Sequence, residues 1–569
     1  MPKRKCTFND KLKTKYPFVK QRSDPSDVTC EKCRTDFSVA HGGAGDIEKH
    51  LRSEKHKLSD HAAASSSSML NFFKKTDSPS SKDFEVTAAE ATWAYHTVQE
   101  SHSFRSNDCA SRLIQTCFEQ KFKCARTKSE AIVVNVLAPM AIHELNDHLH
   151  KANCITLLTD ASNHGSTKLF PVLVRYFLPY EGVQVKILDF QEQPGETSDI
   201  IVDYLKQVLT KNELTSKIVA FCGDNTNCNF GGKNRKGVNN VYAKLNTSLG
   251  RTLIGIGCGA HIIHNAVKTA ADCLPVDFEC IIVKIYSFFY IYSVRVEALK
   301  EFCNAANTEY KQLLGYTTFH QAVLKIEGQN VSAIDAANEI NQLQNNLDQK
   351  QNSCYLPHAT RNIMVKLQET GDINKENVKT AASNFYKTSK EYLEQWCQFN
   401  EEVKKFEWAN LRKVPSWEDV QKVMDLLIEQ KFISSSQDTG VFDEFSLISK
   451  YITAQKIYDW NTGNIPTENR WVEVVTHFNA NDLSHVNFSI IIEYILCLPG
   501  SNAPVERVFS LMNKIWSSEK SQLGVGVLKA ILITKGNINK SCQEFHSYIK
   551  TKQATLKQIC GSDKYKSAE

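Results

Sequence analysis

The sequence predicts a mixed α/β protein with a small Cys/His-rich unit near its N-terminus. Strand-like and helix-like patterns alternate between residues 85 and 270. Residues 271–475 have mainly helical patterns, and residues 24–60 hold closely spaced cysteines and histidines. The chain has 569 residues, of which 42% are hydrophobic. A chain of this size can bury a large core and form roughly two to four domains.

The α/β part is defined by short apolar runs rich in β-branched residues. Candidate strands cover residues 154–159, 170–177, 183–190, 217–222 and 252–257. The first ends at Asp160, the fourth ends at Asp224, and the last leads into a helix at His261. A helix is expected at residues 197–210, between the third and fourth strands. The first three strands predict an antiparallel meander and the later ones predict crossovers, which is compatible with a ribonuclease-H-like sheet.

Charge is unevenly distributed. The net charge is +5 overall, but residues 1–22 have Asp10 as their single acid beside many basic residues. These basic residues are Lys3, Arg4, Lys5, Lys11, Lys13, Lys15, Lys20 and Arg22. We interpret residues 1–23 as a disordered basic arm suited to phosphate contact or nuclear import, and a solvated tail is the alternative.

The apolar runs and the cysteines bear on the cellular compartment in which the protein is expected. The N-terminus is polar and charged, and the most apolar stretch, residues 281–292, is shorter than a bilayer span. The 18 cysteines are mostly scattered, many of them inside apolar runs. We therefore expect a soluble intracellular protein whose cysteines are core thiols or metal ligands.

A candidate zinc site lies in residues 24–60. Cys30 and Cys33 form a Cys-x-x-Cys pair, and His50 and His56 follow. Two thiolates from a tight turn and two imidazoles from a helix make a tetrahedral zinc site. His41, in a Gly-rich loop, is a weaker candidate ligand.

The second half of this unit is expected to be a helix from Asp46 to Lys57. Its cations are candidate contacts to DNA phosphates or bases, namely Lys49, Arg52, Lys55 and Lys57. Binding to protein or RNA is the alternative. The unit resembles BED-type and matrin-like zinc fingers.

Residues 61–84 form a Ser-rich linker that contains a short aromatic motif. Met69, Phe72 and Phe73 precede two lysines. This pattern resembles the motif that docks on replication sliding clamps. Exposed aromatic residues favour a partner, and packing back onto the core is the alternative.

Two acidic residues are candidates for metal chemistry. Asp160 and Asp224 each follow an apolar strand, and sites of α/β sheets form at that edge. Two carboxylates brought together repel each other unless a cation lies between them. Magnesium or manganese suits such oxygen ligands, and a third carboxylate would complete the site. The alternative is that each aspartate only forms a turn.

Four ordered motifs resemble those of hAT-family DNA transposases. They are Leu157-Leu158-Thr159-Asp160-Ala161-Ser162, Phe221-Cys222-Gly223-Asp224-Asn225-Thr226, Gly257-Cys258-Gly259-Ala260-His261 and Pro499-Gly500-Ser501-Asn502-Ala503-Pro504-Val505-Glu506-Arg507-Val508-Phe509-Ser510. The last looks like the C-terminal dimerisation signature of that family. The resemblance spans about residues 150–300 and 490–540.

The resemblance implies a ribonuclease-H-like core interrupted by a helical insertion, in a nuclear, dimeric DNA-binding protein. Asp160, Asp224 and Glu506 become the catalytic carboxylates that bind magnesium or manganese. Cys258 and His261 become active-site neighbours with a packing or orienting role. His264, one helical turn further on, is expected to be a core histidine. The expected segments after the linker are 85–270 for the first part of the core, 271–475 for the insertion, 476–550 for a C-terminal dimerisation region that completes the core, and 551–569 for a polar tail. A homodimer or higher homo-oligomer is expected to form through the C-terminal region.

The insertion departs from the family pattern. A Thr-Arg-Trp stretch is expected soon after residues 309–316, but Tyr316 runs into Thr317-Thr318-Phe319-His320. Asn469-Arg470-Trp471 comes much later and does not look equivalent. An aromatic residue there would help to handle an unpaired base at a cleaved end. Two functions therefore stay open, a transposase-like nuclease and a catalytically inactive, dimeric DNA-binding or scaffolding protein.

Overall fold

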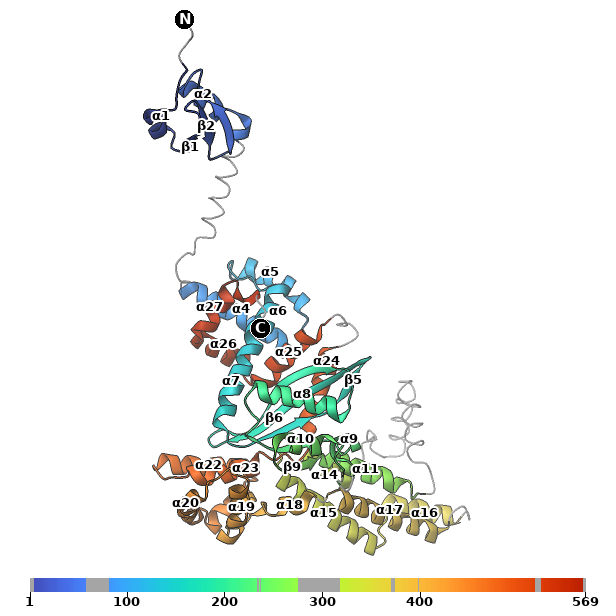
Figure 1. Cartoon of the computed structure of the whole chain (residues 1–569). Coiled ribbons are helices and arrows are strands. Elements are labelled where there is room, and N and C mark those ends of the chain that lie inside the picture. Colours follow the sequence, from blue (N-terminus) through green and yellow to red (C-terminus); the bar gives the residue numbers. More distant parts are fainter. Residues whose placement is uncertain are drawn as a thin grey trace. The chain divides into compact units, whose positions relative to one another are not determined.

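The computed structural model describes residues 5–57, 81–232, 235, 237–274, 318–369, 374–397, 399–516 and 523–565. The chain divides into two compact units, Met1–Lys82 and Asp83–Glu569 (Figure 1). The sliding-clamp-like motif at Met69, Phe72 and Phe73 lies outside the described residues. Within those residues, no helix is long and apolar enough to span a membrane.

The N-terminal unit is a three-stranded antiparallel sheet with a helix on either side of it in the sequence. Its elements are α1 (Asp10–Lys15), β1 (Val19–Gln21), β2 (Asp27–Cys30), β3 (Thr35–Ser38) and α2 (Ala44–Leu51). A small apolar core contains Phe8, Tyr16, Val19, Val28, Val39 and Ile47. The first three of these belong to the segment expected to be a disordered arm. That expectation was wrong, because apolar residues placed between the lysines anchor the segment to the sheet.

The second unit is built on one mixed sheet. Its strands are β4 (Ile155–Thr159), β5 (Ser162–His164), β6 (Thr167–Leu178), β7 (Gly182–Gln193), β8 (Ile218–Gly223) and β9 (Ile254–Gly257). The long strand β6 pairs antiparallel with β7, with the short β5 and with β4. Strands β4, β8 and β9 are neighbours and run parallel. The expected meander and crossovers are both confirmed.

Both faces of this sheet are covered. The side chains of β4 alternate, so that Ile155 and Leu157 join one apolar cluster and Leu158 joins the other. The first face is covered by α8 (Ser198–Lys211), α10 (Val241–Leu249) and part of α7 (Ala138–Lys151). The second face is covered by α11 (Gly259–Ala271), α23 (Val486–Leu496), α24 (Ala503–Ile515) and α25 (Val525–Asn537). A strand buried on both faces explains the continuous apolar runs in the sequence.

The start and the end of this unit pack together. Helices α4 (Ser81–Gln99), α5 (Asn107–Cys117) and α6 (Arg126–Ile132) lie beside α26 (Cys542–Thr551) and α27 (Gln553–Cys560) (Figure 1). Tyr95 of α4 stacks on Phe545 and donates its hydroxyl to the carbonyl of Ile538 at 3.0 Å. Two expectations change. Residues 81–151 are helical rather than alternating, and the polar tail carries α27, whose Leu556 and Ile559 are buried.

The region expected to be a helical insertion is mainly helical in its described parts. Its helices are α14 (Thr318–Ile326), α15 (Ala333–Asn352), α16 (His358–Glu369), α17 (Lys375–Trp396), α18 (Phe399–Lys404), α19 (Trp417–Glu429), α20 (Asp438–Tyr451), α21 (Ala454–Thr462) and α22 (Thr467–Ala480). Trp471 of α22 is fully buried against Trp408 and donates its indole N–H to Ala409 at 2.7 Å. Trp471 is therefore a packing residue.

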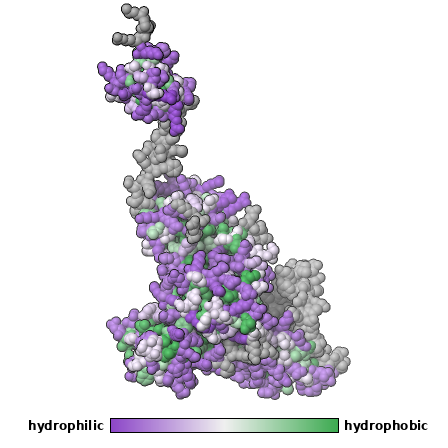
Figure 2. Space-filling model, in the orientation of Figure 1, coloured by the Kyte–Doolittle hydropathy of each residue, from purple (hydrophilic) through white to green (hydrophobic). Residues whose placement is uncertain are grey.

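The sequence patterns located every strand of the mixed sheet except β5, but they missed helices both before the sheet and between its strands. β6 and β7 are longer than expected, and α9 (Asn227–Phe230) and α10 lie unpredicted between β8 and β9. The face of the molecule seen in Figure 2 is mainly hydrophilic, with hydrophobic residues in scattered groups.

Candidate metal centres

The first centre lies in the N-terminal unit. Cys30 ends β2, Cys33 lies in the turn before β3, His50 is on α2, and His56 follows in a separate helical turn. The ligand atoms of all four residues lie within 4.8 Å of one another. The Cys33 sulfur is 3.2 Å from Nε2 of His50, and the Cys30 sulfur is 3.5 Å from Nδ1 of His56. The four predicted residues therefore converge in an arrangement that can hold a metal ion.

The surroundings of this centre favour ligation. Burial, helped by the charge of His56, lowers the pKa of His50, which keeps its imidazole in the neutral form that binds metals. Phe37 stacks on the His50 ring with 4.2 Å between centroids and fixes its orientation. The weaker candidate His41 is exposed in the loop before α2 and does not belong to the cluster.

The helix of this unit differs from the expectation. It ends at Leu51, and the chain bends at Arg52 and Ser53 before the turn that carries His56. The prediction of one helix from Asp46 to Lys57 was therefore wrong. The bend changes the direction of the chain before His56, so that the imidazoles of His50 and His56 both lie beside the two cysteines. The candidate DNA contacts are exposed, namely Lys49, Arg52, Lys55 and Lys57.

The second centre lies at the edge of the mixed sheet where its parallel strands end. Asp160 directly follows β4, Asp224 follows β8 and Cys258 follows β9. Leu158 of β4 pairs with Cys222 of β8, so the two aspartates emerge at the same level of the sheet. Gly257 at the end of β9 has no room for a side chain, because a Cβ would lie 1.9 Å from Oδ1 of Asn225. The chain after β8 thus packs closely against the end of β9.

Asp160 is in an unfavourable place for a negative charge. Burial raises the pKa of its carboxyl to about 6, with the nearby Asp224 as the next cause and Glu506 as a smaller one. His261 and a hydrogen bond from the backbone N–H of Ala161 act in the opposite direction. Asp160 therefore lies within electrostatic reach of both other predicted carboxylates.

Asp224 has partners of its own. Its Oδ1 accepts a hydrogen bond from the Thr226 hydroxyl at 2.8 Å and another from the side-chain amide of Asn229. Thr226 also caps α9, whose residue Asn229 is buried. The short unpredicted helix α9 thus orients this carboxylate. The sequence offered a signal for α9, because Thr226 is a typical residue before a helix and Gly231 a typical residue at its end, where the backbone is left-handed.

Glu506 lies in the first turn of α24, after Pro504, and reaches the same edge from the far end of the sequence. Its Oε1 is 3.4 Å from Nδ1 of His261. The ligand atoms of Glu506, His261 and Cys258 lie within 4.8 Å of one another, so these three residues can also hold a metal ion. The sequence placed Cys258 and His261 near the site but did not identify Glu506 as their partner.

His261 is a cationic neighbour of the carboxylates. A hydrogen bond with Cys258 is the largest cause that raises the pKa of His261, to about 9; the charges of Glu506 and Asp160 contribute to this rise, and burial opposes it. His264, expected to be a core histidine, is instead exposed on α11. That expectation was wrong because α11 buries its other face, with Ile262, Ile263 and Ala266.

Asn502 holds the site together and was given no role from the sequence. It is fully buried, its side-chain amide donates to the carbonyl of Thr159 at 3.0 Å, and its backbone N–H points to the Cys258 sulfur at 3.4 Å. It therefore joins the start of α24 to the ends of β4 and β9. Gly500 is equally constrained, since a Cβ there would lie 2.8 Å from the carbonyl of Ser332.

No family model and no curated protein matches this chain.

Proposed function

We propose that this chain is a nuclear DNA-binding protein of the hAT transposase type, with a zinc finger and a ribonuclease-H-like core. The observation that carries the proposal is that Asp224 and Glu506 both act on the charge of Asp160 at one sheet edge, although the ligand atoms that cluster there belong to Cys258, His261 and Glu506. Glu506 is separated from Asp160 by most of the chain, yet both contribute to one electrostatic environment. The strands lie in the order β7-β6-β4-β8-β9. The first three of these strands pair antiparallel in turn, and β4, β8 and β9 pair parallel in turn, which agrees with a ribonuclease-H-like sheet.

Zinc is the metal proposed for the N-terminal unit. Two thiolates and two imidazoles are the donor set that zinc prefers in structural sites, and all four sites of coordination are filled by the protein. Its ligand atoms are already clustered. The small apolar core of the unit supports a structural role, because few residues other than the ligands hold it together.

DNA is the proposed partner of this finger. Lys49, Arg52, Lys55 and Lys57 are exposed on or after α2, where they can contact phosphates, although Lys57 also pairs with Glu54 at 3.6 Å. Residues 1–22 add further basic side chains, which also support nuclear import. Binding that depends on such cations weakens steeply as salt increases.

The carboxylates fit a pair of divalent cations. Asp160 is a buried acid among like charges, and the buried Oε1 of Glu506 forms no regular hydrogen bond within the described residues, although Nδ1 of His261 lies 3.4 Å away. Oxygen donors of this kind suit magnesium or manganese. Such ions would activate a water or hydroxyl nucleophile and stabilise the leaving oxygen of a phosphodiester. Asp160, Asp224 and Glu506 would hold them, and Thr226 and Asn229 would keep Asp224 oriented.

His261 would contribute a positive charge beside this site. Its raised pKa keeps it protonated at neutral pH. An imidazolium next to the carboxylates is able to attract a backbone phosphate and to donate a proton to a departing oxygen.

A cleavage assay tests the proposal. The full chain is incubated with duplex DNA and Mg²⁺, and Asp160→Asn is compared with Asp203→Asn, an exposed aspartate on α8. We expect nicks with the wild type and Asp203→Asn, and none with Asp160→Asn. Equal cleavage by all three proteins would remove Asp160 from the proposed role.

One observation favours a second candidate, a non-enzymatic DNA-binding or scaffolding protein. Glu506 lies among Cys258 and His261, and Asp224 already accepts two hydrogen bonds from neighbouring side chains. A chain of this kind would bind DNA without Mg²⁺ and cleave none of it.

A homodimer is proposed in both cases. Because α25 packs on β7 and α7 within the chain, the subunits of a dimer would contact each other through other surfaces. The molecular mass of the protein in solution tests whether it is a dimer.

A further inference from the structure

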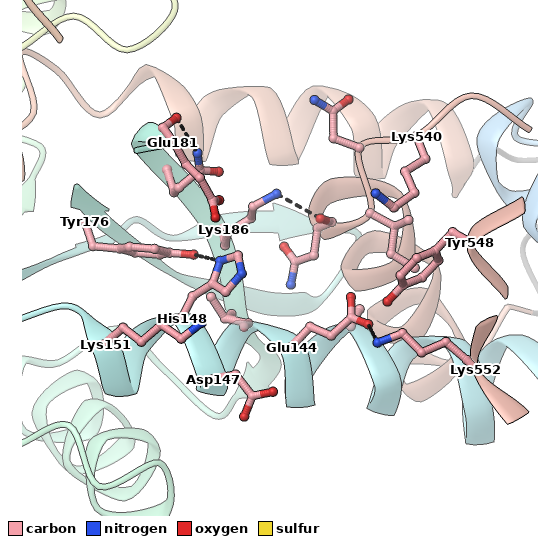
Figure 3. A pocket seen from close by; sticks show the side chains of 16 residues that line it. Glu144, Asp147, His148, Lys151, Tyr176, Glu181, Lys186, Lys540, Tyr548 and Lys552 are labelled. Carbon is pink, nitrogen blue, oxygen red and sulfur yellow. Dashed lines mark hydrogen bonds and ion pairs between the residues drawn. The ribbon is translucent and has the colours of Figure 1, made fainter. Parts of the chain in front are cut away.

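A cavity lies at the opposite edge of the sheet from the carboxylates. It is lined by α7, by the ends of β6 and β7, and by the segment that joins α25 to α26 (Figure 3). Tyr176 of β6 lines it and pairs with Ile155, the first residue of β4, whereas Asp160 follows the last. The cavity encloses about 420 Å³, which is in the range of small-ligand sites.

Lysines from four parts of the chain line this cavity. They are Lys151, Lys186, Lys540 and Lys552. Lys552 forms an ion pair with Glu144 at 3.0 Å. Among the described residues, no carboxylate lies within ion-pair distance of the other three lysines. The cavity also contains Glu181 and Asp147, and Figure 3 shows the Asp147 carboxylate turned away from the labelled lysines.

Lys186 is the most informative of these lysines. Its ammonium group donates one hydrogen bond to the carbonyl of Asn537 at 2.8 Å. Burial lowers its pKa, Glu181 offsets part of this effect, and Lys540 lowers the pKa by a smaller amount. A buried ammonium group beside a like charge is costly unless an anion offsets it. Its remaining N–H groups are available to such an anion.

Tyr548 supplies a neutral donor to the same cavity. Its hydroxyl is buried and has no hydrogen-bond partner within the described parts of the chain. The ammonium groups of Lys540 and Lys552 lie 4.8 and 4.9 Å from the centre of its ring. Two cations and an unused hydroxyl therefore converge from one wall, with Lys186 on the facing wall (Figure 3).

The walls are held in place without a ligand. The side chain of Asn537 accepts from the backbone N–H of Ile187 and donates to its carbonyl, both at 2.8 Å. The Tyr95 hydroxyl lies 2.7 Å from the carbonyl of Lys540 and donates there or to Ile538. The segment that carries Lys540 is thus fastened to β7 and to α4, so the donors are pre-positioned and binding does not have to order them.

We propose that this cavity binds a phosphate group through Lys186, Lys540, Lys552 and the Tyr548 hydroxyl. Several separate lysines match the multiple charges and oxygens of a phosphate better than those of a single carboxylate. The phosphate belongs either to a nucleic-acid backbone or to a free phosphorylated ligand. The site is separate from the carboxylate edge and does not depend on the function proposed for it.

Inorganic tripolyphosphate and a short DNA duplex serve as the two probes. Isothermal titration calorimetry of the full chain measures tripolyphosphate, and fluorescence anisotropy measures DNA. The DNA arm uses a Cys33→Ala background, so that the N-terminal unit does not mask the effect. The variants are Lys540→Gln and Tyr548→Phe, and the control is Lys557→Gln, an exposed lysine of α27 outside the cavity. Tyr548→Phe keeps the ring and removes only the hydroxyl, which protects the fold.

We expect Lys540→Gln and Tyr548→Phe to weaken binding of a probe about tenfold each, with Lys557→Gln unchanged. A loss for tripolyphosphate alone identifies a free phosphorylated ligand. A loss for DNA identifies a backbone contact. The proposal is overturned if wild type binds neither probe, or if both variants bind each probe as tightly as the control.

Discussion

The two candidate metal centres differ in whether their residues contact mainly one another or other side chains. In the N-terminal unit, each of the two cysteines lies within 3.5 Å of a histidine. At the carboxylate edge, each acid has another neighbour: Asp224 accepts from Thr226 and Asn229, and Glu506 lies beside His261. The first centre resembles a closed structural site. In the second, the proposed ligands are held by separate elements and have other partners.

The largest expected effect of this difference is on folding. Cys33→Ala should unfold the N-terminal unit, since structural zinc contributes about 10–16 kcal/mol to finger peptides. The second unit should keep its thermal transition. Zinc content and limited proteolysis measure both. Cys6→Ala, an exposed cysteine of the same unit, is the control and should retain zinc. A folded, zinc-free Cys33→Ala unit would contradict the structural role.

At the carboxylate edge, removal of a ligand should stabilise the protein instead. Folding raises the pKa of Asp160 to about 6, so the folded chain holds this proton more tightly than the unfolded chain does. Its ionisation therefore costs stability that builds up as the pH rises from the ordinary value of 3.8 to about 6, and the full cost remains above that. Without metal, Asp160→Asn should increase the free energy of unfolding by about 3 kcal/mol at pH 8 and by about half as much at pH 5.

Denaturant titrations at the two pH values measure this gain, with Asp203→Asn as the matched control. A gain that is equal at both values, or one shared by the control, would show that the buried charge of Asp160 is not its source.

A smaller effect is expected from the residue that joins the strands to α24. Asn502→Ala leaves the carbonyl of Thr159 without its donor and should cost about 1–3 kcal/mol of stability. Because Asn502 positions the turn that carries Glu506, the variant should also bind Mn²⁺ more weakly. Unfolding curves and Mn²⁺ titration separate the two effects. Unchanged Mn²⁺ affinity in a destabilised variant would limit Asn502 to a packing role.

The smallest effect concerns the exposed cations of the finger. Each of Lys49→Gln and Arg52→Gln should reduce the slope of log affinity against log salt by about one for duplex DNA. Lys557→Gln in the second unit should leave the slope unchanged in the same titration. A slope that none of these variants alters would place the DNA contacts elsewhere.

The ligands of the finger could be predicted because their spacing is local. Cys30 and Cys33 share one turn, and His50 and His56 are close in the sequence. The bend at Arg52 and Ser53 could not be predicted, because neither residue is a strong helix breaker. The folded state of residues 8–21 was missed because the many lysines of this segment outweigh its three core residues, Phe8, Tyr16 and Val19, in the sequence pattern.

Part of the carboxylate edge was also accessible from the sequence. The strand ends place Asp160 and Asp224, and a family motif points to Glu506. The partners of these acids are tertiary, however. Asn229 comes from an unpredicted helix, and Asn502 bridges elements that are remote in the sequence. His264 was misplaced because a shift of one residue along α11 separates the buried Ile263 from the exposed His264.

Mn²⁺ binding to the full chain tests the central claim most directly, because it reports the shared site without a DNA target. Mn²⁺ prefers oxygen ligands and discriminates against the thiolate site of the finger. Calorimetric titration should show binding to the wild type and to Asp203→Asn, and its loss in Asp160→Asn and Asp224→Asn. Equal binding by all four proteins, or none by the wild type, would contradict a common metal site at this edge.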